Sequence, residues 1–166
     1  MENISLIQDI RTFAFSAENP TGARAGGSRG GDCTKLRPCI DIHPGETVTL
    51  VDTDGPGMIQ NIWFTGYVGH SFILRIYWEG DETPSVEAPI SAFFGCAYDE
   101  NFEDREGRYP ILNSAKILVA PGRGFNCYWE MPFRKHCRIT MENRSDEDKT
   151  LFYMITGCYM SLPENI

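Results

Sequence analysis

The chain has 166 residues, a length typical of a single domain. Its residues are 42% hydrophobic and 12% aromatic, which is enough to fill a core and excludes a disordered chain. With 23 acidic against 15 basic residues, the net charge of −8 excludes the basic surface that nucleic acids and anionic membranes require. No apolar run approaches the ~18 residues of a membrane-spanning helix. We therefore expect neither nucleic acid nor a membrane among its partners.

The N-terminal residues and the cysteines together indicate a cellular compartment. Met1 to Ser5 are not basic and no apolar stretch follows them, so we expect no signal peptide and a cytoplasmic location. In such a compartment cysteines are reduced. The six cysteines, at positions 33, 39, 96, 127, 137 and 158, are accordingly expected to be free thiols, most of them buried.

A metal site is the alternative interpretation of some of these cysteines. Cys33, Cys39 and His43 follow a C-x5-C-x3-H spacing, and His136 precedes Cys137. No C-x2-C pair occurs, and neither spacing matches a common zinc knuckle. We therefore expect no metal, with Cys33, Cys39 and His43 as the ligands if one is present.

The first 35 residues are predicted to form a short N-terminal helix and a Gly-rich arm. Four apolar residues, Ile4, Leu6, Ile7 and Ile10, form one stripe of a helix over residues 2–12. The segment 16–31 contains five glycines and few bulky side chains, so it predicts a loop or arm. This segment is either a flexible linker or a loop that orders over a ligand or a neighbouring subunit.

From Leu36 to Ile166 the sequence predicts one all-β domain. Short β-branched and aromatic segments alternate with Gly/Pro turns, which is typical of a sandwich or jelly roll and not of a βαβ fold. The predicted strands are 47–51, 58–65, 72–78, 86–88, 92–97, 115–119, 125–131, 137–143 and 151–159. The expected fold is a single β-jelly roll built from two packed antiparallel sheets.

Aromatic and acidic residues in the predicted strands suggest carbohydrate chemistry. Trp63, Trp78 and Trp129 lie in strands, and two of them precede a glutamate. Aromatic rings suit the apolar face of a sugar, although tryptophans in strands are more often core residues. The candidate substrate-binding residues are Trp63, Trp129 and Arg134, although pairing with a sheet carboxylate is the alternative role of Arg134. Glycoside hydrolysis needs two carboxyl groups, and the candidates are Asp54, Glu79, Glu87 and Glu130.

Other kinds of site lack their sequence patterns. The segment 98–108 carries five acidic residues but no D-x-D-x-D-G pattern, so a solvated loop is favoured over a calcium site. No G-x-S-x-G elbow occurs, and Gly122-Arg123-Gly124 is not followed by the lysine of a phosphate loop. We therefore expect no cofactor.

Six motifs follow one another along the chain: Ser16–Gly22, Pro44–Glu46, Asp54–Ile59 through Trp63, Leu74–Gly80, Pro84–Pro89 and Asn126–Arg134. In this order they resemble the landmarks of one family, glycoside hydrolase family 172, formerly the domain of unknown function 2961. The similarity begins near residue 14 and runs to the C-terminus. The resemblance implies a tandem of two β-jelly rolls in each chain, assembly into trimers and larger rings, and hydrolysis of fructofuranose or arabinofuranose linkages by a pair of glutamates.

Two departures from the family pattern affect the catalytic residues. The resemblance places the family's glutamates in a second jelly roll, whereas this sequence ends at Ile166, where that roll would begin. The family motif Pro-Leu-Gly-Asp-Phe-Phe corresponds to residues 89–94, in which Ala92 replaces the acid. No catalytic glutamate is therefore transferred to a position of this chain.

The expected function is a self-assembling single jelly roll, a homo-oligomer of hexamer type or, second, a trimer, without the family's catalytic glutamates. Six one-roll subunits would fill the roll positions of three two-roll subunits in a closed ring. One alternative is a furanoside hydrolase whose site forms between subunits. The other is a carbohydrate-binding module.

Overall fold

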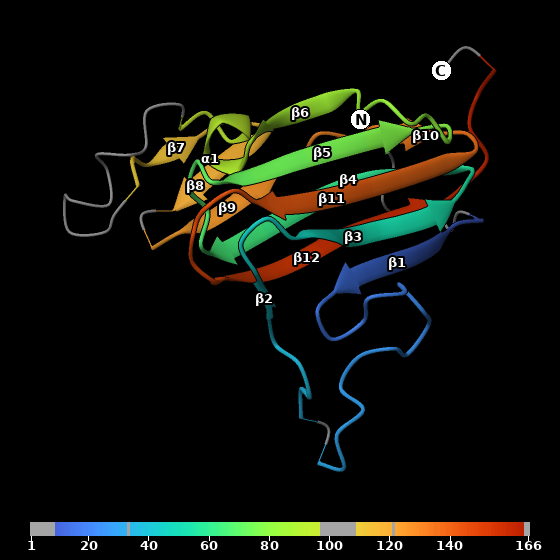
Figure 1. The fold of residues 1–166 in the computed structure, drawn as a ribbon. Helices are drawn as coiled ribbons and strands as arrows, with labels where there is room; N and C mark the ends of the chain where they lie inside the picture. The colour runs from blue at the N-terminus through green and yellow to red at the C-terminus, as the bar shows by residue number, and fades with distance from the viewer. Residues whose placement is uncertain (1–8, 33, 97–108, 121, 165–166) are drawn as a thin grey trace.

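The computed structural model describes residues 9–32, 34–96, 109–120 and 122–164 (Figure 1). Within these ranges the chain forms strands and one short helix. The elements are β1 (Arg11–Ser16), β2 (Ile40–Ile42), β3 (Thr47–Asp54), β4 (Gly57–Gly66), β5 (Phe72–Trp78), β6 (Val86–Pro89), α1 (Ile90–Phe93), β7 (Leu112–Asn113), β8 (Ile117–Ala120), β9 (Gly124–Cys127), β10 (Met131–Phe133), β11 (His136–Asn143) and β12 (Lys149–Tyr159). None of the described residues belongs to a helix long and apolar enough to cross a membrane.

The strands form two antiparallel sheets that face each other (Figure 1). The eight-stranded sheet has the order β1-β12-β4-β9-β8-β7, with β10 paired to β4 and β2 paired to β12. The four-stranded sheet has the order β3-β11-β5-β6. Neighbours in both sheets are mostly far apart in the sequence. The predicted all-β fold, a jelly-roll sandwich of two antiparallel sheets, is confirmed.

The core lies between the sheets because strand residues alternate between an apolar and a polar face. On β5, the side chains of Phe72, Leu74 and Ile76 are completely buried and face the other sheet. Side chains of β4, β9 and β12 meet them from the opposite layer. The largest fully buried side chains are Phe15, Phe64, Phe72, Phe94, Phe125 and Phe133. Phenylalanine thus supplies the largest side chains of a core that isoleucine, leucine and valine complete.

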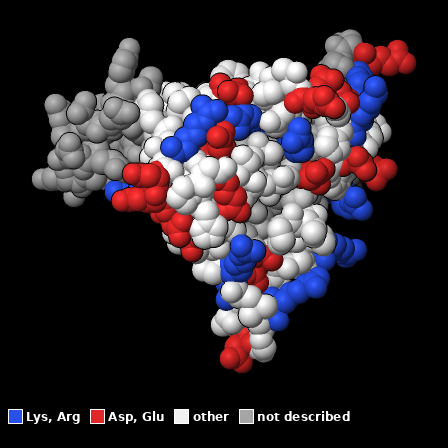
Figure 2. All heavy atoms as spheres, in the orientation of Figure 1, with Lys and Arg blue, Asp and Glu red and all other residues white. Residues whose placement is uncertain are grey.

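The outer face of the four-stranded sheet is covered by its own charged side chains. Arg75 donates to Glu87 at 2.8 Å and to Glu142 at 2.6 Å, from neighbouring strands on either side. Arg138 stacks on the ring of Tyr77, with its guanidinium carbon 3.8 Å from the ring centroid. Figure 2 views the molecule from this side, where acidic and basic side chains are intermixed. This face therefore satisfies its charges within the sheet.

The N-terminal segment differs from the prediction. The helix expected over residues 2–12 lies mostly outside the described residues, but Arg11 and Thr12 begin strand β1 and are not helical. In β1, Phe13 and Phe15 are buried and alternate with more exposed residues. This period of two, together with the edge that β12 offers, favours a strand. The jelly roll therefore includes residues that were assigned to the N-terminal arm.

The expected strand at 92–97 is also wrong over its described residues. Residues Ile90–Phe93 form α1, in which the backbone N–H of Phe94 donates to the carbonyl of Ile90 at 3.3 Å. Pro89 precedes the helix, and Gly95 follows it with a φ of +83°. Proline before a helix and a left-handed glycine after it are ordinary boundary signals. The two signals outweigh the β-branched and aromatic character of this segment.

The expected strand at 125–131 is interrupted. It divides into β9 and β10, and residues 128–130 between them are not in a strand. β9 pairs with β4 at Ile62 to Phe64, whereas β10 pairs with β4 at Gly57 to Ile59. The chain must therefore move along β4 between the two contacts. The short strands β1, β2 and β7 were not predicted, and the acidic segment 98–108 lies outside the described residues.

Candidate functional site

The long connection between β1 and β2, residues 17–39, begins and ends beside the same strand. β1 pairs with β12 from Tyr159 to Met154, and β2 pairs with β12 from Leu151 to Lys149. The β1–β2 loop (residues 17–39) therefore leaves and rejoins the sheet at adjacent points along β12 (Figure 1). Its two ends are brought to the outer face of the eight-stranded sheet beside Phe152.

Side chains within the β1–β2 loop hold it in place. The amide of Asn19 donates to the carbonyls of Ala14 and Ala23, both at 3.0 Å, and its oxygen accepts from the N–H of Ala23. The carboxylate of Glu18 accepts from the backbone N–H of Arg37 at 2.7 Å. That hydrogen bond lowers the pKa of Glu18 below its ordinary value. Glu18 thus ties the start of the loop to its end.

A groove of about 690 Å³ lies between the β1–β2 loop and the outer face of the eight-stranded sheet. This volume is within the range of sites for small molecules. The lining residues come from both sides of the groove. They are Ser16, Glu18, Gly27, Ser28, Lys35, Arg37 and Pro38 from β1 and the loop, and Asn61, Trp63, Asn126, Tyr128, Phe152, Tyr153 and Met154 from the sheet and its edge.

Trp63 lies at the centre of the sheet side of this groove. It is on β4, with Met154 of β12 directly opposite on one side and Asn126 of β9 opposite on the other. The indole is partly exposed, and Met154 is 43% exposed. A flat aromatic ring flanked by an amide is suited to a ligand that has both an apolar face and hydroxyl groups.

The two side-chain amides beside Trp63 differ in the strength of the hydrogen bonds that they already make within the fold. The amide of Asn61 donates to the carbonyl of Cys127 at 3.1 Å. The amide of Asn126 contacts the carbonyls of Leu118 and Gly124 only at 3.5 Å, which is long for a hydrogen bond. A ligand in the groove can therefore bond to the amide of Asn126 without breaking a short hydrogen bond of the fold.

Tyr153 borders the groove, but its side chain belongs to the core: it is 4% exposed and lies opposite the buried Phe64 of β4. Burial raises the pKa of its hydroxyl to about 12, partly offset by the charge of Arg37 nearby. The phenol therefore stays protonated at physiological pH. As a neutral hydroxyl it can both donate and accept a hydrogen bond.

Two of the candidate carboxylates lie at one end of the four-stranded sheet. Asp54 is paired in register with His136, and the backbone N–H of Glu79 donates to the carbonyl of His136 from the other side. The carboxylate of Glu79 accepts from the backbone N–H groups of Arg134 and Lys135, both at 2.7 Å. Its two oxygens hold the turn between β10 and β11. Glu79 is thus used by the fold.

The other two candidate carboxylates lie elsewhere. Glu87 is on β6, where it is paired with Arg75 on the outer face of the four-stranded sheet. Glu130 is an exposed residue between β9 and β10. None of the four candidate carboxylates lines the groove. Among the residues that line the groove, Glu18 is the one carboxylate.

The candidate substrate-binding residues are separated by the fold. Trp63 lines the groove, whereas Trp129 is 52% exposed in the segment between β9 and β10 and is not among the lining residues. Arg134 donates through its guanidinium to the carbonyl of Pro163 at 2.5 Å. That contact fixes the C-terminal segment that follows β12. The third tryptophan, Trp78, stacks on Phe133 with ring centroids 6.4 Å apart.

The cysteines that the structure describes are mostly core residues. Cys96, Cys127, Cys137 and Cys158 are buried, and Cys39 is partly exposed. Burial, together with the charges of Asp52 and Glu79, raises the pKa of Cys137 to about 12, so that its thiol stays protonated. Cys33 lies outside the described residues. In the part of the chain that the structure describes, no three His, Cys, Asp or Glu side chains are grouped for a metal ion.

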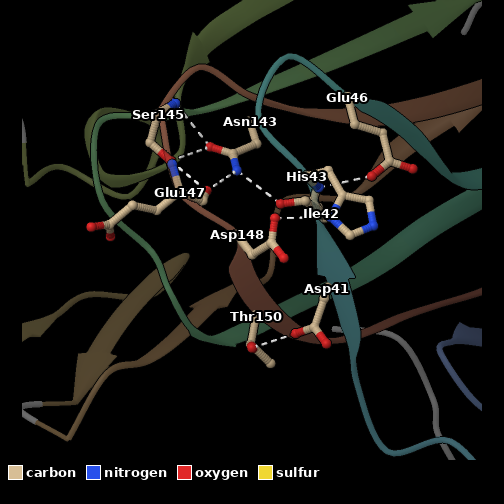
Figure 3. A network of polar contacts seen from close by, with 9 residues as sticks. All are labelled: Asp41, Ile42, His43, Glu46, Asn143, Ser145, Glu147, Asp148 and Thr150. Carbon is tan, nitrogen blue, oxygen red and sulfur yellow. Dashed lines mark hydrogen bonds and ion pairs between the residues drawn. The ribbon is translucent and has the colours of Figure 1, made fainter.

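His43, the third residue of the C-x5-C-x3-H pattern, belongs to a polar network beside Asn143, the last residue of β11 (Figure 3). Its Nδ1 lies 2.9 Å from a carboxylate oxygen of Asp148. This hydrogen bond raises the pKa of His43 above its ordinary value. Beside it, the buried amide of Asn143 donates to the carbonyls of Ile42 and Glu147, both at 2.8 Å. The network joins β2 to the turn between β11 and β12 and is structural.

Sequence reasoning found Trp63 but missed most of the groove. Asn61 lies two positions before Trp63 and so on the same face of β4, a signal that the period of two contains. Asn126 and Met154 reach Trp63 only through strand pairing between distant segments. Lys35 and Arg37 reach the groove only because β1 and β2 pair with the same strand.

A comparison with protein-family models decides the family. The model described as the GH172 first beta-sandwich domain matches residues 10–165. The chain belongs to the GH172 family. The suspected resemblance is therefore confirmed, and the matched region includes strand β1, which the sequence-based boundary had left out. A search of curated proteins finds no match to this GH172 chain.

Proposed function

We propose that this GH172 sandwich domain binds a carbohydrate in the groove between the β1–β2 loop and the outer face of the eight-stranded sheet. The observation that carries the proposal is the position of Trp63, which is partly exposed on the sheet side of a groove of about 690 Å³ with Asn126 and Met154 on its two sides. Its indole stacks on the apolar face of a sugar ring, while the amide of Asn126 bonds to sugar hydroxyls.

The proposed activity at this groove is binding without hydrolysis. Hydrolysis of a glycosidic bond requires two carboxyl groups on either side of the bond. Among the residues that line the groove, Glu18 is the one carboxylate, and it accepts a hydrogen bond from the backbone of Arg37. The candidate carboxylates Asp54, Glu79, Glu87 and Glu130 do not line the groove. A furanoside or other sugar bound there is therefore retained intact.

The proposal is tested by calorimetric titration with a panel of furanose- and pyranose-containing oligosaccharides. We expect saturable binding by the native protein, and a loss of at least tenfold in affinity for Trp63→Ala. Trp129→Ala is the matched control, because Trp129 is more exposed and lies outside the groove. Equal losses in the two variants, or no binding by the native protein, would contradict the proposal. Release of reducing sugar from any panel member that the groove binds would contradict its restriction to binding.

We also propose self-association, in a hexamer or a trimer, as a second property. The observation in its favour is that Trp129, which lies outside the groove, is 52% exposed. Exposed aromatic residues are typical of protein interfaces. A discrete oligomer that becomes smaller in Trp129→Ser would support this contact, whereas an unchanged oligomer would place the interface elsewhere.

A further inference from the structure

The β1–β2 loop carries a charge opposite to that of the whole chain. Residues 17–39 contain four basic side chains, Arg24, Arg29, Lys35 and Arg37, and two acidic ones, Glu18 and Asp32, whereas the chain has a net charge of −8. Figure 2 shows basic side chains on the part of the molecule that this loop forms, below the two sheets as drawn. Positive charge is thus concentrated on the loop that forms one wall of the groove.

Two of these cations, Lys35 and Arg37, line the groove. Lys35 and Arg37 are both exposed lining residues, and neither makes an ion pair with any residue that the structure describes. Glu18 also lines the groove and keeps its negative charge, because its carboxylate bonds to the neutral backbone N–H of Arg37, so the groove carries one net positive charge from its two basic and one acidic lining side chains. On the outer face of the four-stranded sheet, by contrast, Arg75 is paired with Glu87 and Glu142.

We infer that the ligand of this groove is an acidic oligosaccharide, in which Lys35 and Arg37 bind a uronic-acid carboxylate while a sugar ring stacks on Trp63. The inference rests on the proposed carbohydrate binding and names the class of sugar. A guanidinium binds a carboxylate through two parallel hydrogen bonds, and an ammonium adds a point charge beside it. The site therefore selects for charge at the loop and for an apolar ring face at the sheet.

An acidic peptide presents the same carboxylate, but the sheet side of the groove favours a sugar. Trp63 offers a flat face, and Asn126 at the same register has an amide whose existing contacts are 3.5 Å long. A sugar ring uses both at once, through its C–H face and its hydroxyls. A glutamate side chain has neither a flat apolar face nor a hydroxyl.

The test compares uronic-acid trisaccharides with their methyl esters, which keep the rings and hydroxyls and remove the charge. Trimers of galacturonate, glucuronate and mannuronate are each titrated in both forms at low salt. We expect at least one acid to bind about tenfold more tightly than its ester, as charge-assisted hydrogen bonds are worth that much. The difference should shrink in 0.3 M NaCl, because salt screens exposed charges.

Three variants locate the effect. Lys35→Gln and Arg37→Gln should each bring the affinity for the acid close to that for the ester. Lys135→Gln, which removes an exposed lysine at the turn between β10 and β11, should leave the affinity for the acid unchanged. An acid that binds equally to all three variants would overturn the assignment of its carboxylate to Lys35 and Arg37.

The remaining outcomes separate this inference from the proposed function. Equal affinity for acid and ester would overturn the inference and leave carbohydrate binding in place. Failure of every acid and every ester to bind would overturn the inference as well, and titration with neutral oligosaccharides then decides the proposed function by itself. Hexaglutamate that binds as tightly as the best uronate would show that a peptide carboxylate, and not a sugar, is the ligand.

Discussion

Thr140 shows how one buried hydroxyl affects the stability of the four-stranded sheet. It is on β11, opposite Thr49 of β3 and Arg75 of β5, and it is only 3% exposed. Its Oγ1 has no hydrogen-bond partner among the described residues. A buried hydroxyl without a partner loses its hydration and gains nothing in return.

Replacing Thr140 by valine should therefore stabilise the protein. We expect Thr140→Val to raise the free energy of unfolding by about 1 kcal/mol, because the β-branched shape is kept and the hydroxyl is removed. Thr49→Val is the control, since Thr49 is exposed, and should change stability by less than about 0.5 kcal/mol. Urea unfolding measures both. A less stable Thr140→Val would mean that the hydroxyl has a partner, such as a bound water.

Glu18 makes one contact of the β1–β2 loop dependent on pH. Its pKa in the folded protein is lowered by the hydrogen bond from the Arg37 N–H, so the ionised form is the one that holds the loop. A group with a lowered folded pKa contributes its stability above the unfolded pKa and loses it as the pH falls through the folded pKa.

The protection of one backbone amide should report this dependence. We expect hydrogen exchange at the Arg37 amide to be slowed near pH 6, relative to an unstructured peptide, and to lose that protection as the pH falls below 4.5, the unperturbed pKa of Glu18. Glu18→Ala should abolish the protection at every pH. Asp32→Ala, which removes the other acidic residue of the loop, is the control and should keep it. Protection in Glu18→Ala equal to that of the native protein would contradict this role.

At the level of elements, Asn143 connects the end of β11 to the end of β2 and to the turn between β11 and β12. Its amide donates to Ile42 at the end of β2 and to Glu147 in the turn before β12, and its oxygen accepts from the N–H of Ser145 (Figure 3). The residue is completely buried. Its removal takes the side-chain donor from the carbonyl of Ile42 in the protein interior and also removes the part-buried contacts with Glu147 and Ser145.

We expect Asn143→Ala to lower the free energy of unfolding by about 3 kcal/mol, since each buried group left without a partner costs about 1–3 kcal/mol. Asn113→Ala provides the control, because Asn113 is an exposed residue of β7. Its effect should be within about 0.5 kcal/mol of zero. Thermal and urea unfolding of the two variants checks the difference. Equal stabilities would mean that water replaces the amide at little cost.

The sequence predicted those elements whose signals are local. The alternation in β5 and the Gly/Pro turns around it placed that strand correctly. The helix predicted over residues 2–12 is wrong at Arg11 and Thr12, which belong to a strand in which Phe13 and Phe15 have strand spacing. β1 became a strand through pairing with β12, a contact that no local pattern contains. Tertiary pairing decided where local signals conflicted.

Of the residues that line the groove, the sequence singled out only Trp63. Trp63 stood out by type and position, but its neighbours Asn126 and Met154 depend on strand register. The carboxylates chosen as catalytic candidates were plausible by composition, yet Glu79 holds a turn and Glu87 pairs with Arg75. A carboxylate's role follows from its partners, which composition does not contain.

For the whole molecule, the prediction concerns mass in solution. We expect light scattering at micromolar concentration to give a discrete homo-oligomer, a hexamer or second a trimer, as closed rings are the usual form of symmetric assemblies. The charged face of the four-stranded sheet should not be the interface, because Arg75 and Glu142 are paired within it. Glu142→Gln should therefore leave the mass unchanged. A monomer of the native protein would contradict self-association.

The three indole groups allow carbohydrate binding to be located directly. Trp63 lies in the groove, Trp129 is exposed outside it, and Trp78 stacks on Phe133. Titrating the 15N-labelled protein with the oligosaccharide panel and following the three indole N–H resonances by NMR measures all of them in one sample. We expect the Trp63 resonance to shift saturably while those of Trp78 and Trp129 stay in place. No saturable shift with any sugar, or a shift confined to Trp129, would contradict binding in this groove.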